Sequence, residues 1–310
     1  MRDRGSRVQR WTAAGFTTVL TLFTVFVLLD TFVVAHPYAA VAPEPTVGLI
    51  SPTSRIPLTP PTPSCGQTPA PDPVTYADSD RAVSVTGYRV DSTDVYVADI
   101  QLSDPVYLTT AFAGNTYGRN ITATTSSIAE ASGAILAVNG DFYGARRSGY
   151  VVRDSQVYRD QVASAGQEDL AVMGDGTWQI IQEGQISAAA LVAQGARQVF
   201  SFGPGLVDRG RTMVDADTEV DRAQASNPRT AIAQVGASHY LFVVADGRTS
   251  ASAGLNLAQL GDFLVSCGAQ TACNLDGGGS STMWFRGEVV NQPTDGRSTS
   301  ERKVSDIVYI

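Results

Sequence analysis

Alternating apolar and polar residues predict a strand-rich domain in the second part of the chain. Apolar side chains, mostly valines and aromatics, are spaced by polar ones in three successive segments, Arg81–Val90, Asp94–Leu102 and Val106–Phe112. This pattern predicts strands, because successive side chains of a strand point to opposite faces. Two more segments, Tyr150–Arg159 and Leu170–Ile181, are predicted hairpins that turn at Asp154-Ser155 and at Gly174-Asp175-Gly176.

Helical periodicity is confined to a few short segments of this domain. Three leucines of Leu257–Ser266 share one face, Asn256 can cap the start, and Gly268 follows the end. Thr125–Ser132 and Ser187–Ala196 are shorter predicted helices, and Val304–Ile310 is a closing strand. Strands and helices follow one another without regular βαβ alternation. We therefore predict an α+β fold, with a mainly antiparallel or mixed sheet in a single domain.

Three short apolar runs end in an acid next to a glycine. Residues 134–138 lead into Asn139-Gly140-Asp141, residues 240–245 lead into Asp246-Gly247, and residues 271–275 lead into Asp276-Gly277. Continuous apolar runs are typical of strands that are buried on both faces, so whatever follows them is rigidly supported. Asp-Gly is also ordinary turn chemistry. Because the pattern occurs three times, we expect the three acids to surround one site.

Two arginines flank a further predicted hairpin. Arg229 and Thr230 precede the strand over residues 231–235, the turn is at 236–238, and Arg248 follows the return strand. The ends of an antiparallel pair meet at one edge of a sheet, so both guanidinium groups should lie there and bind an anion. The alternative is a pair of structural Arg–Asp salt bridges.

Residues 274–285, NLDGGGSSTMWF, place three glycines and three hydroxyl residues between apolar neighbours. A flexible linker would not carry such flanks, and a nucleotide-binding P-loop would need a lysine. Glycine permits close approach to the backbone. We therefore expect some group to approach the backbone closely at Gly277, Gly278 and Gly279, where the hydroxyls of Ser280, Ser281 and Thr282 add hydrogen-bond donors.

The N-terminal part of the chain predicts a membrane anchor and a spacer. Trp11–Leu29 is free of charge and follows four arginines, which favours a span with the remainder of the chain outside. A cleaved signal peptide with its site at Ala40-Val41-Ala42 is the alternative. Eleven of the fifteen prolines fall in residues 37–73. The predicted organisation is an anchor in 1–36, a Pro/Thr/Ser-rich linker in 37–73 and the catalytic domain in 74–310.

Charge, cysteine content and missing motifs limit the partners and reaction types that we expect for this chain. The net charge is −8 and residues 1–10 contribute +4 − 1 = +3, so the remainder carries about −11 and nucleic acid is not an expected partner. Cys267 and Cys273 are close enough in sequence to pair outside the cell. A Ser-His-Asp triad is disfavoured because His239 falls mid-strand. The alternating acids of residues 215–221 lack the mid-loop glycine of an EF-hand, which disfavours that kind of calcium site. We expect no cofactor. The sequence leaves open whether a divalent cation is bound.

The motifs from Asn139 to Gly144, Asn227 to Ile232, Asp246 to Arg248 and Asn274 to Met283, in this order, resemble the phosphodiester glycosidase family. The resemblance extends from about Thr122 to Ile310. It implies hydrolysis of a sugar-1-phosphodiester in a phosphorylated glycan, at the C1–O bond. The phosphate would then be bound by the backbone amides of the three glycines and by the three hydroxyls of residues 277–282. The catalytic candidates, in order of preference, are Asp276, Asp141 and Asp246, and the resemblance implies that Asn139 and Thr230 orient substrate.

Two alternatives stay open at this stage. The first is a non-catalytic module that binds cell-wall or exopolysaccharide glycan at the end of the spacer. The second is a phosphodiesterase that cleaves the O–P bond, a reaction that usually relies on metal ions. The carboxylates at strand ends favour a glycosidase over both.

Overall fold

The structure, a computed structural model, describes residues 3–40, 57–61, 65–66, 72–214, 224–296 and 298–310. An eight-stranded antiparallel sheet forms its centre, in the order β14-β13-β17-β15-β16-β4-β3-β2. Its strands are β2 (Val74–Ala77), β3 (Arg81–Val90), β4 (Thr93–Leu102), β13 (Gly205–Asp208), β14 (Arg211–Thr212), β15 (Arg229–Gly236), β16 (His239–Ala245) and β17 (Thr271–Leu275).

Two five-stranded antiparallel sheets accompany the central one. The first has the order β19-β18-β7-β22-β5 and consists of β5 (Thr109–Phe112), β7 (Leu136–Asn139), β18 (Met283–Phe285), β19 (Glu288–Val289) and β22 (Asp306–Tyr309). The second has the order β11-β10-β12-β8-β9 and consists of β8 (Val151–Arg153), β9 (Gln156–Arg159), β10 (Glu168–Met173), β11 (Trp178–Gln182) and β12 (Ala196–Phe200).

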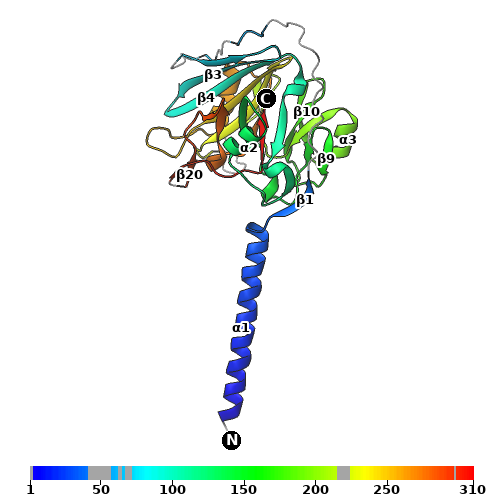
Figure 1. The fold of residues 1–310 in the computed structure, drawn as a ribbon, viewed down its shortest axis with the longest axis vertical. Coiled ribbons are helices and arrows are strands. Elements are labelled where there is room, and N and C mark those ends of the chain that lie inside the picture. The colour runs from blue at the N-terminus through cyan, green and yellow to red at the C-terminus, as the bar shows by residue number, and fades with distance from the viewer. Residues whose placement is uncertain (1–2, 41–56, 62–64, 67–71, 215–223, 297) are drawn as a thin grey trace.

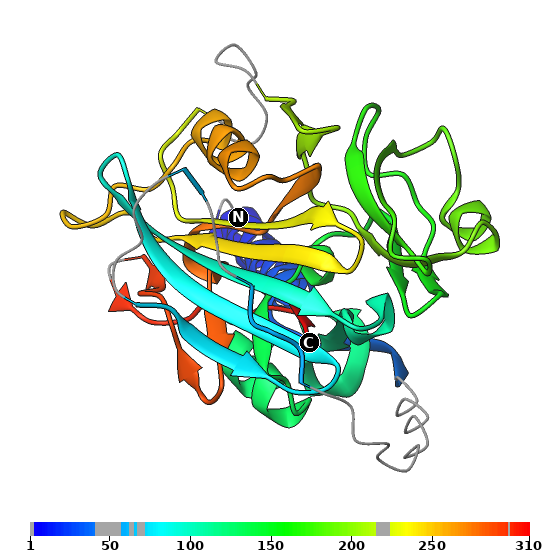
Figure 2. The ribbon, with the colours of Figure 1, turned by 90° about the horizontal axis from the view of Figure 1, so that it is seen from above.

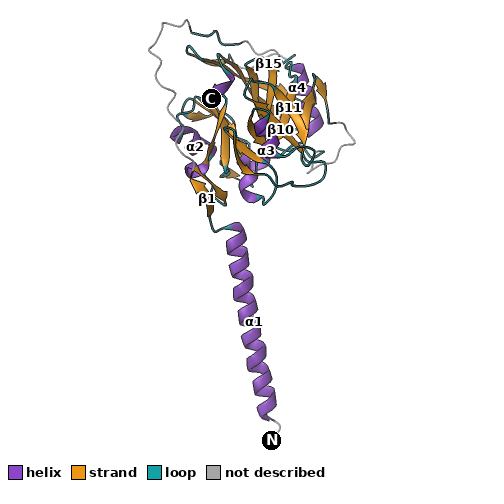
Figure 3. Cartoon of the chain, turned by 90° about the vertical axis from the view of Figure 1, so that its right-hand side faces the viewer, coloured by secondary structure: helices purple, strands orange, loops and turns teal. Residues whose placement is uncertain are grey.

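Two small ribbons, four α-helices and four 3-10 helices complete the described elements. The ribbons pair β1 (His36–Ala40) with β6 (Thr116–Arg119), and β20 (Thr294–Asp295) with β21 (Ser298–Thr299). The helices are α1 (Asp3–Phe32), α2 (Thr125–Ala131), α3 (Ala188–Ala193) and α4 (Leu257–Ser266). Helix α1 projects from the domain as a single rod, and β1 lies next to its end (Figures 1 and 3).

The central sheet is buried on both faces. One face packs on α4, where Leu260 and Leu264 join a cluster with Val97 and Leu241; Figure 2 shows α4 lying over the strands of this sheet. The opposite face packs on the five-stranded sheets, in a cluster that includes Phe242. This double burial explains the continuous apolar runs, since neither face of these strands meets water. Packing on both faces also holds the ends of these strands rigidly.

The predicted α+β fold is confirmed, and several element boundaries shift; the predicted strand Val106–Phe112 is an example. Residues Pro105–Tyr107 form a 3-10 turn, and the strand begins only at Thr109. Asp104 causes this start, because its Oδ1 accepts a hydrogen bond from the Val106 amide at 2.8 Å and Pro105 follows at the first helical position. The Asn256 cap of α4 is present as a complete capping box with Gln259.

The predicted cysteine pairing is wrong. Cys65 forms a disulfide with Cys267, and Cys273 is a buried free thiol on β17. Cys273 faces the core cluster between the sheets, whereas Cys267 ends α4 on the other side of the central sheet. The sheet therefore separates the two cysteines that are close in sequence. Most of the proline-rich stretch, the Val41-Ala42 part of the signal-peptidase site and the acids of residues 215–221 lie outside the described residues.

Candidate active site

A pocket opens where the ends of β15 and β17 meet. Thr230 pairs with Leu275 across these antiparallel strands, so the start of one and the end of the other share an edge. The pocket encloses about 210 Å³. Ligand pockets commonly measure roughly 300–1,000 Å³, so this one fits a small polar group. Its lining consists of Phe202, Gly203, Pro204, Asn227, Arg229, Arg248, Leu257, Asn274, Asp276, Gly277, Gly278 and Arg302.

Arg229 and Arg248 both line this pocket, as the hairpin argument predicts. Arg229 is buried and donates to the carbonyls of Leu255 (3.0 Å) and Ala225 (2.8 Å). Arg248 donates from Nε and one terminal nitrogen to Oδ1 of Asn227, at 3.2 and 3.1 Å. Burial, together with the positive charge of Arg248, lowers the pKa of Arg229 to about 10. The two guanidinium groups repel each other, so an anion between them is stabilised.

Asp276 is the acid of the pocket. Ser280 donates to its Oδ2 at 2.6 Å. Burial raises the pKa of the Asp276 carboxyl, while this hydrogen bond and the charges of Arg302 and Arg146 oppose the shift. A carboxylate with a raised pKa beside cationic groups can act as a base or a nucleophile near neutral pH.

The three glycines are required by protein groups that approach the backbone. A Cβ on Gly277 would lie 2.9 Å from the carbonyl oxygen of Pro228, and one on Gly278 would lie 2.9 Å from a terminal nitrogen of Arg248. A Cβ on Gly279 would meet Asp295 at 2.5 Å and Arg302 at 2.8 Å. Gly278 also has φ +63°, which disfavours any side chain. The glycines therefore let the cationic side chains sit directly against the loop.

Two of the expected phosphate donors of the loop, the Gly278 amide and the Ser280 hydroxyl, form hydrogen bonds with protein groups in this structure. The Gly278 amide donates to the Pro228 carbonyl at 2.8 Å, and the Thr282 amide donates to Oδ1 of Asn139 at 3.3 Å. Ser280, Ser281 and Thr282 are at most 1% exposed, and none of them lines the pocket. Their hydroxyls lie behind the site, where the one of Ser280 orients Asp276.

Asn139 joins three of the sequence motifs and is completely buried. Its Nδ2 donates to the Asp276 carbonyl at 2.7 Å, and its Oδ1 accepts from the Thr230 hydroxyl at 2.8 Å and from the Thr282 amide. We expect Asn139 and Thr230 to orient substrate; in the structure both side chains are buried and form hydrogen bonds with protein groups. These bonds connect both residues to the Asp276 loop.

Asp141 does not line the pocket, because it belongs to a buried ion cluster. Its Oδ2 accepts from Arg153 at 3.0 Å and from the Ser201 amide at 3.2 Å. Arg153 also binds Asp306 at 2.7 Å. Burial and the charge of Asp141 raise the pKa of Asp306. One guanidinium thus holds two carboxylates together inside the domain.

Asp246 is also directed away from the pocket. Its Oδ1 accepts from Nδ2 of Asn291 at 2.9 Å, and both of its oxygens accept from the Gln292 amide at 3.1 Å. Burial raises the pKa of Asp246, while these hydrogen bonds oppose the shift. Of the three acids that end apolar strands, Asp276 alone lines the described pocket.

Sequence reasoning assigned no site role to two cations close to Asp276. Arg302 lines the pocket and binds Asp295 at 2.8 Å, and Arg146 is near enough to favour the charged form of Asp276. Neither arginine ends an apolar run. The signal available was position alone, since Arg146 follows the Asn139–Gly144 motif closely and Arg302 precedes the closing strand.

A family model and one curated relative match this chain. The family model described as phosphodiester glycosidase matches residues 132–310. A SPbeta prophage-derived uncharacterized protein, YomE, of Bacillus subtilis (strain 168) is 30% identical over 200 residues, which is 63% of this chain. This chain spans about 30% of the length of that relative.

Two solved structures share the fold. The first is the catalytic domain of zebrafish N-acetylglucosamine-1-phosphodiester alpha-N-acetylglucosaminidase, auto-inhibited by its pro-peptide. It has a TM-score of 0.59 and 19% identity, over 78% of this chain and 84% of that one. The second is a hypothetical protein from Synechocystis, with a TM-score of 0.56 and 16% identity, over 77% of this chain and 64% of that one.

Proposed function

This chain belongs to the phosphodiester glycosidase family, and we propose that it hydrolyses the C1–O bond of a sugar-1-phosphodiester in a phosphorylated glycan. One observation carries the proposal: a carboxylate, Asp276, lines the same small pocket as two neighbouring guanidinium groups, those of Arg229 and Arg248. The arginines bind the phosphate, and the carboxylate acts at the anomeric carbon.

The leaving group suits this set of residues. A phosphate monoester has a second pKa of about 6, so it departs without the strong general acid that an alcohol leaving group needs. The pocket has to stabilise the charge that develops on the departing phosphate. Fixed cations in a site that excludes water are effective for this purpose.

We assign the reactive carboxylate to Asp276, and positioning roles to the other two acids. Asp276 lies at the rigid end of β17, and the Ser280 hydroxyl orients it. Asp141 holds Arg153, and Asp246 accepts hydrogen bonds from Asn291 and the Gln292 amide. Replacing Asp276 by Asn should lower kcat by more than about 100-fold, with little change in the thermal midpoint.

The bond that breaks can be tested directly by hydrolysis in heavy-oxygen water. A sugar-1-phosphodiester is incubated with the full chain, the products are separated, and the mass of each product is determined by mass spectrometry. C1–O cleavage places the label on the sugar. Label on the phosphate overturns the glycosidase assignment and favours a phosphodiesterase. Release of no reducing sugar under any condition favours a non-catalytic glycan-binding module.

The phosphate role of the arginines has a separate test. Arg229→Gln and Arg248→Gln should raise KM roughly 10-fold or more, because a charged hydrogen bond contributes about 1.5–3 kcal/mol. Arg211→Gln is the matched control, since this exposed arginine on β14 does not line the pocket. Unchanged KM in both pocket variants would make the two arginines purely structural.

We further propose that α1 anchors the chain in a membrane, with the glycosidase domain outside. Gly15–Phe32 is apolar enough to span a bilayer, with a mean hydropathy of 1.8. Arg2, Arg4, Arg7 and Arg10 precede it, which favours a cytoplasmic N-terminus. The substrate is then a cell-wall or exopolysaccharide glycan. Digestion of intact cells with external protease should remove the domain; complete release of a shortened domain into the medium would indicate a signal peptide instead.

A further inference from the structure

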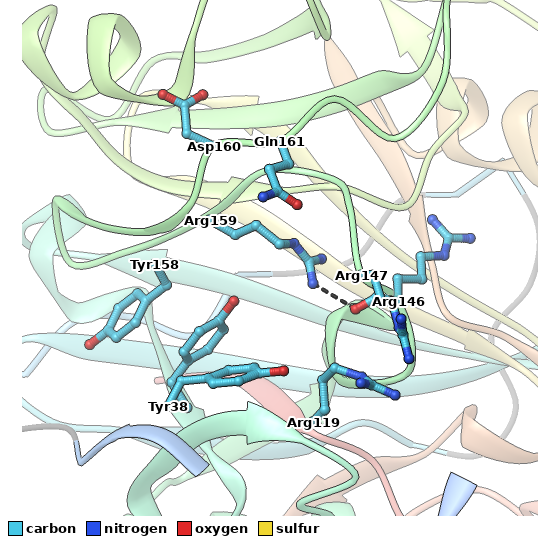
Figure 4. A pocket seen from close by; sticks show the side chains of 9 residues that line it. Tyr38, Arg119, Arg146, Arg147, Tyr158, Arg159, Asp160 and Gln161 are labelled. Atoms are coloured by element: carbon cyan, nitrogen blue, oxygen red, sulfur yellow. Dashed lines mark hydrogen bonds between the residues drawn. The ribbon is translucent and has the colours of Figure 1, made fainter. Parts of the chain in front are cut away.

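A second and larger pocket lies where the β1–β6 ribbon meets β9 and the loop after β7. It encloses about 540 Å³ and shares no lining residue with the candidate active site. Three tyrosines (Tyr38, Tyr117, Tyr158) and four arginines (Arg119, Arg146, Arg147, Arg159) line it, together with Asp160 and Gln161 (Figure 4). We name it the arginine–tyrosine pocket.

The pocket is strongly cationic. Asp160 is the one acid of its described lining, and Asp160 already accepts hydrogen bonds from the Ala188 amide at 2.7 Å and from the Ala189 amide at 3.3 Å. It thus satisfies the start of α3, and Figure 4 shows it pointing away from the arginines. Asp160 therefore does not neutralise the arginines of this pocket.

Two of the arginines are held in place by backbone carbonyls. Arg159 donates to the carbonyls of Tyr143 at 3.1 Å and of Arg146 at 2.8 Å, and its burial lowers its pKa. Arg119 donates to the carbonyl of Thr31 at 3.0 Å, while its buried Nε has no hydrogen-bond partner in the described chain. A buried donor without a partner is uncommon in proteins and indicates a missing acceptor.

The position of the pocket indicates which ligand its arginines would bind. Thr31, whose carbonyl Arg119 contacts, lies in the last turn of the apolar helix α1. The neighbouring Asn120 donates to the carbonyls of Thr31 at 3.1 Å and Val34 at 2.9 Å. Tyr38 follows within β1. The pocket therefore starts at the end of the predicted span, the depth at which tyrosines concentrate and lipid phosphates lie.

We propose that the arginine–tyrosine pocket binds the phosphate of an anionic phospholipid headgroup in the membrane that α1 spans. Guanidinium groups bind phosphate oxygens through paired hydrogen bonds, and the tyrosines contact the glycerol region from the side. This inference rests on the proposed span of α1. It does not depend on the glycosidase activity.

The test is native mass spectrometry of the full chain in detergent, titrated with phosphatidylglycerol or with phosphatidylcholine. The wild type should retain one phosphatidylglycerol with at least about fivefold preference. Arg147→Glu and the double variant Arg119→Gln/Arg147→Gln should lower this retention by about 10- to 30-fold, as expected for two basic residues near a lipid surface. Arg211→Gln is the control and should bind as the wild type does.

Three results would overturn the inference: equal retention of both lipids, unchanged retention in the variants, or displacement of phosphatidylglycerol by inorganic phosphate at the same concentration. The last would indicate a site for soluble phosphates. Arg119 contacts α1 and its loss can disturb the junction, whereas Arg147 is exposed, so the single Arg147→Glu variant keeps the test valid. Arg146 is left unchanged because its charge acts on Asp276.

Discussion

Gly278→Ala tests whether the glycine loop exists to seat Arg248 against the backbone. The new Cβ would lie 2.9 Å from one terminal nitrogen of Arg248, and 3.3 Å from its central carbon and its other terminal nitrogen. Ordinary contact begins at about 3.4 Å, so the guanidinium must retreat by roughly 0.5 Å. The end of a flexible side chain can make this move, and the protein should still fold.

Two costs are expected, and they can be separated. Placing Ala at φ +63° costs about 1 kcal/mol of folding stability. Displacing the guanidinium weakens a charged hydrogen bond to the phosphate, which contributes about 1.5–3 kcal/mol when intact. Losing half of it would raise KM about 4- to 13-fold. Gly133→Ala is the matched control, because Gly133 has φ +64° and nothing within 4 Å of its Cβ position.

The assay combines urea denaturation with the kinetics of sugar-1-phosphodiester hydrolysis. Both variants should lose the same stability, while only Gly278→Ala should raise KM. If Gly278→Ala keeps the wild-type KM, or if Gly133→Ala raises KM equally, the loop does not act through Arg248 and the reasoning is wrong.

Three further predictions concern buried groups. Asn139→Ala should lower the free energy of unfolding in urea by about 2–4 kcal/mol, because it leaves several buried polar groups without partners. Its effect on kcat should be larger than its effect on KM. A change in KM alone would place Asn139 in the substrate site. Burial and Glu183 raise the pKa of Asp169 to about 10 from 3.8. Since the unfolded state then binds fewer protons between these values, stability falls as pH rises through this window. Asp169→Asn should be more stable than the wild type at pH 8, by on the order of 1–3 kcal/mol, and equal to it below pH 3.8; parallel pH profiles would contradict this. Cys65→Ser should lower the free energy of unfolding by about 2–4 kcal/mol, measured against the wild type under oxidising conditions, and reductant should abolish the difference.

The sequence by itself determined the elements of the fold and the edge at which the site lies. Strand alternation, the Asn256 cap and the apolar runs are local signals, because side-chain direction repeats every two residues in a strand and about every 3.6 in a helix. They place Arg229, Arg248 and Asp276 at strand ends without knowledge of the partner strands. The three glycines of the loop also predicted a close approach to the backbone, but they did not predict which atoms approach.

Only the tertiary structure decided which carboxylate faces the pocket. Asp141, Asp246 and Asp276 follow the same kind of run, but Arg153 and Asn291 lie elsewhere in the chain and engage the first two. The disulfide also depends on the tertiary structure, since its two cysteines are 202 residues apart in the sequence. Such contacts depend on the order of strands and on the face of the sheet that each residue meets. Chain neighbours carry no information about either, so these partners emerge only when the sheets pack together.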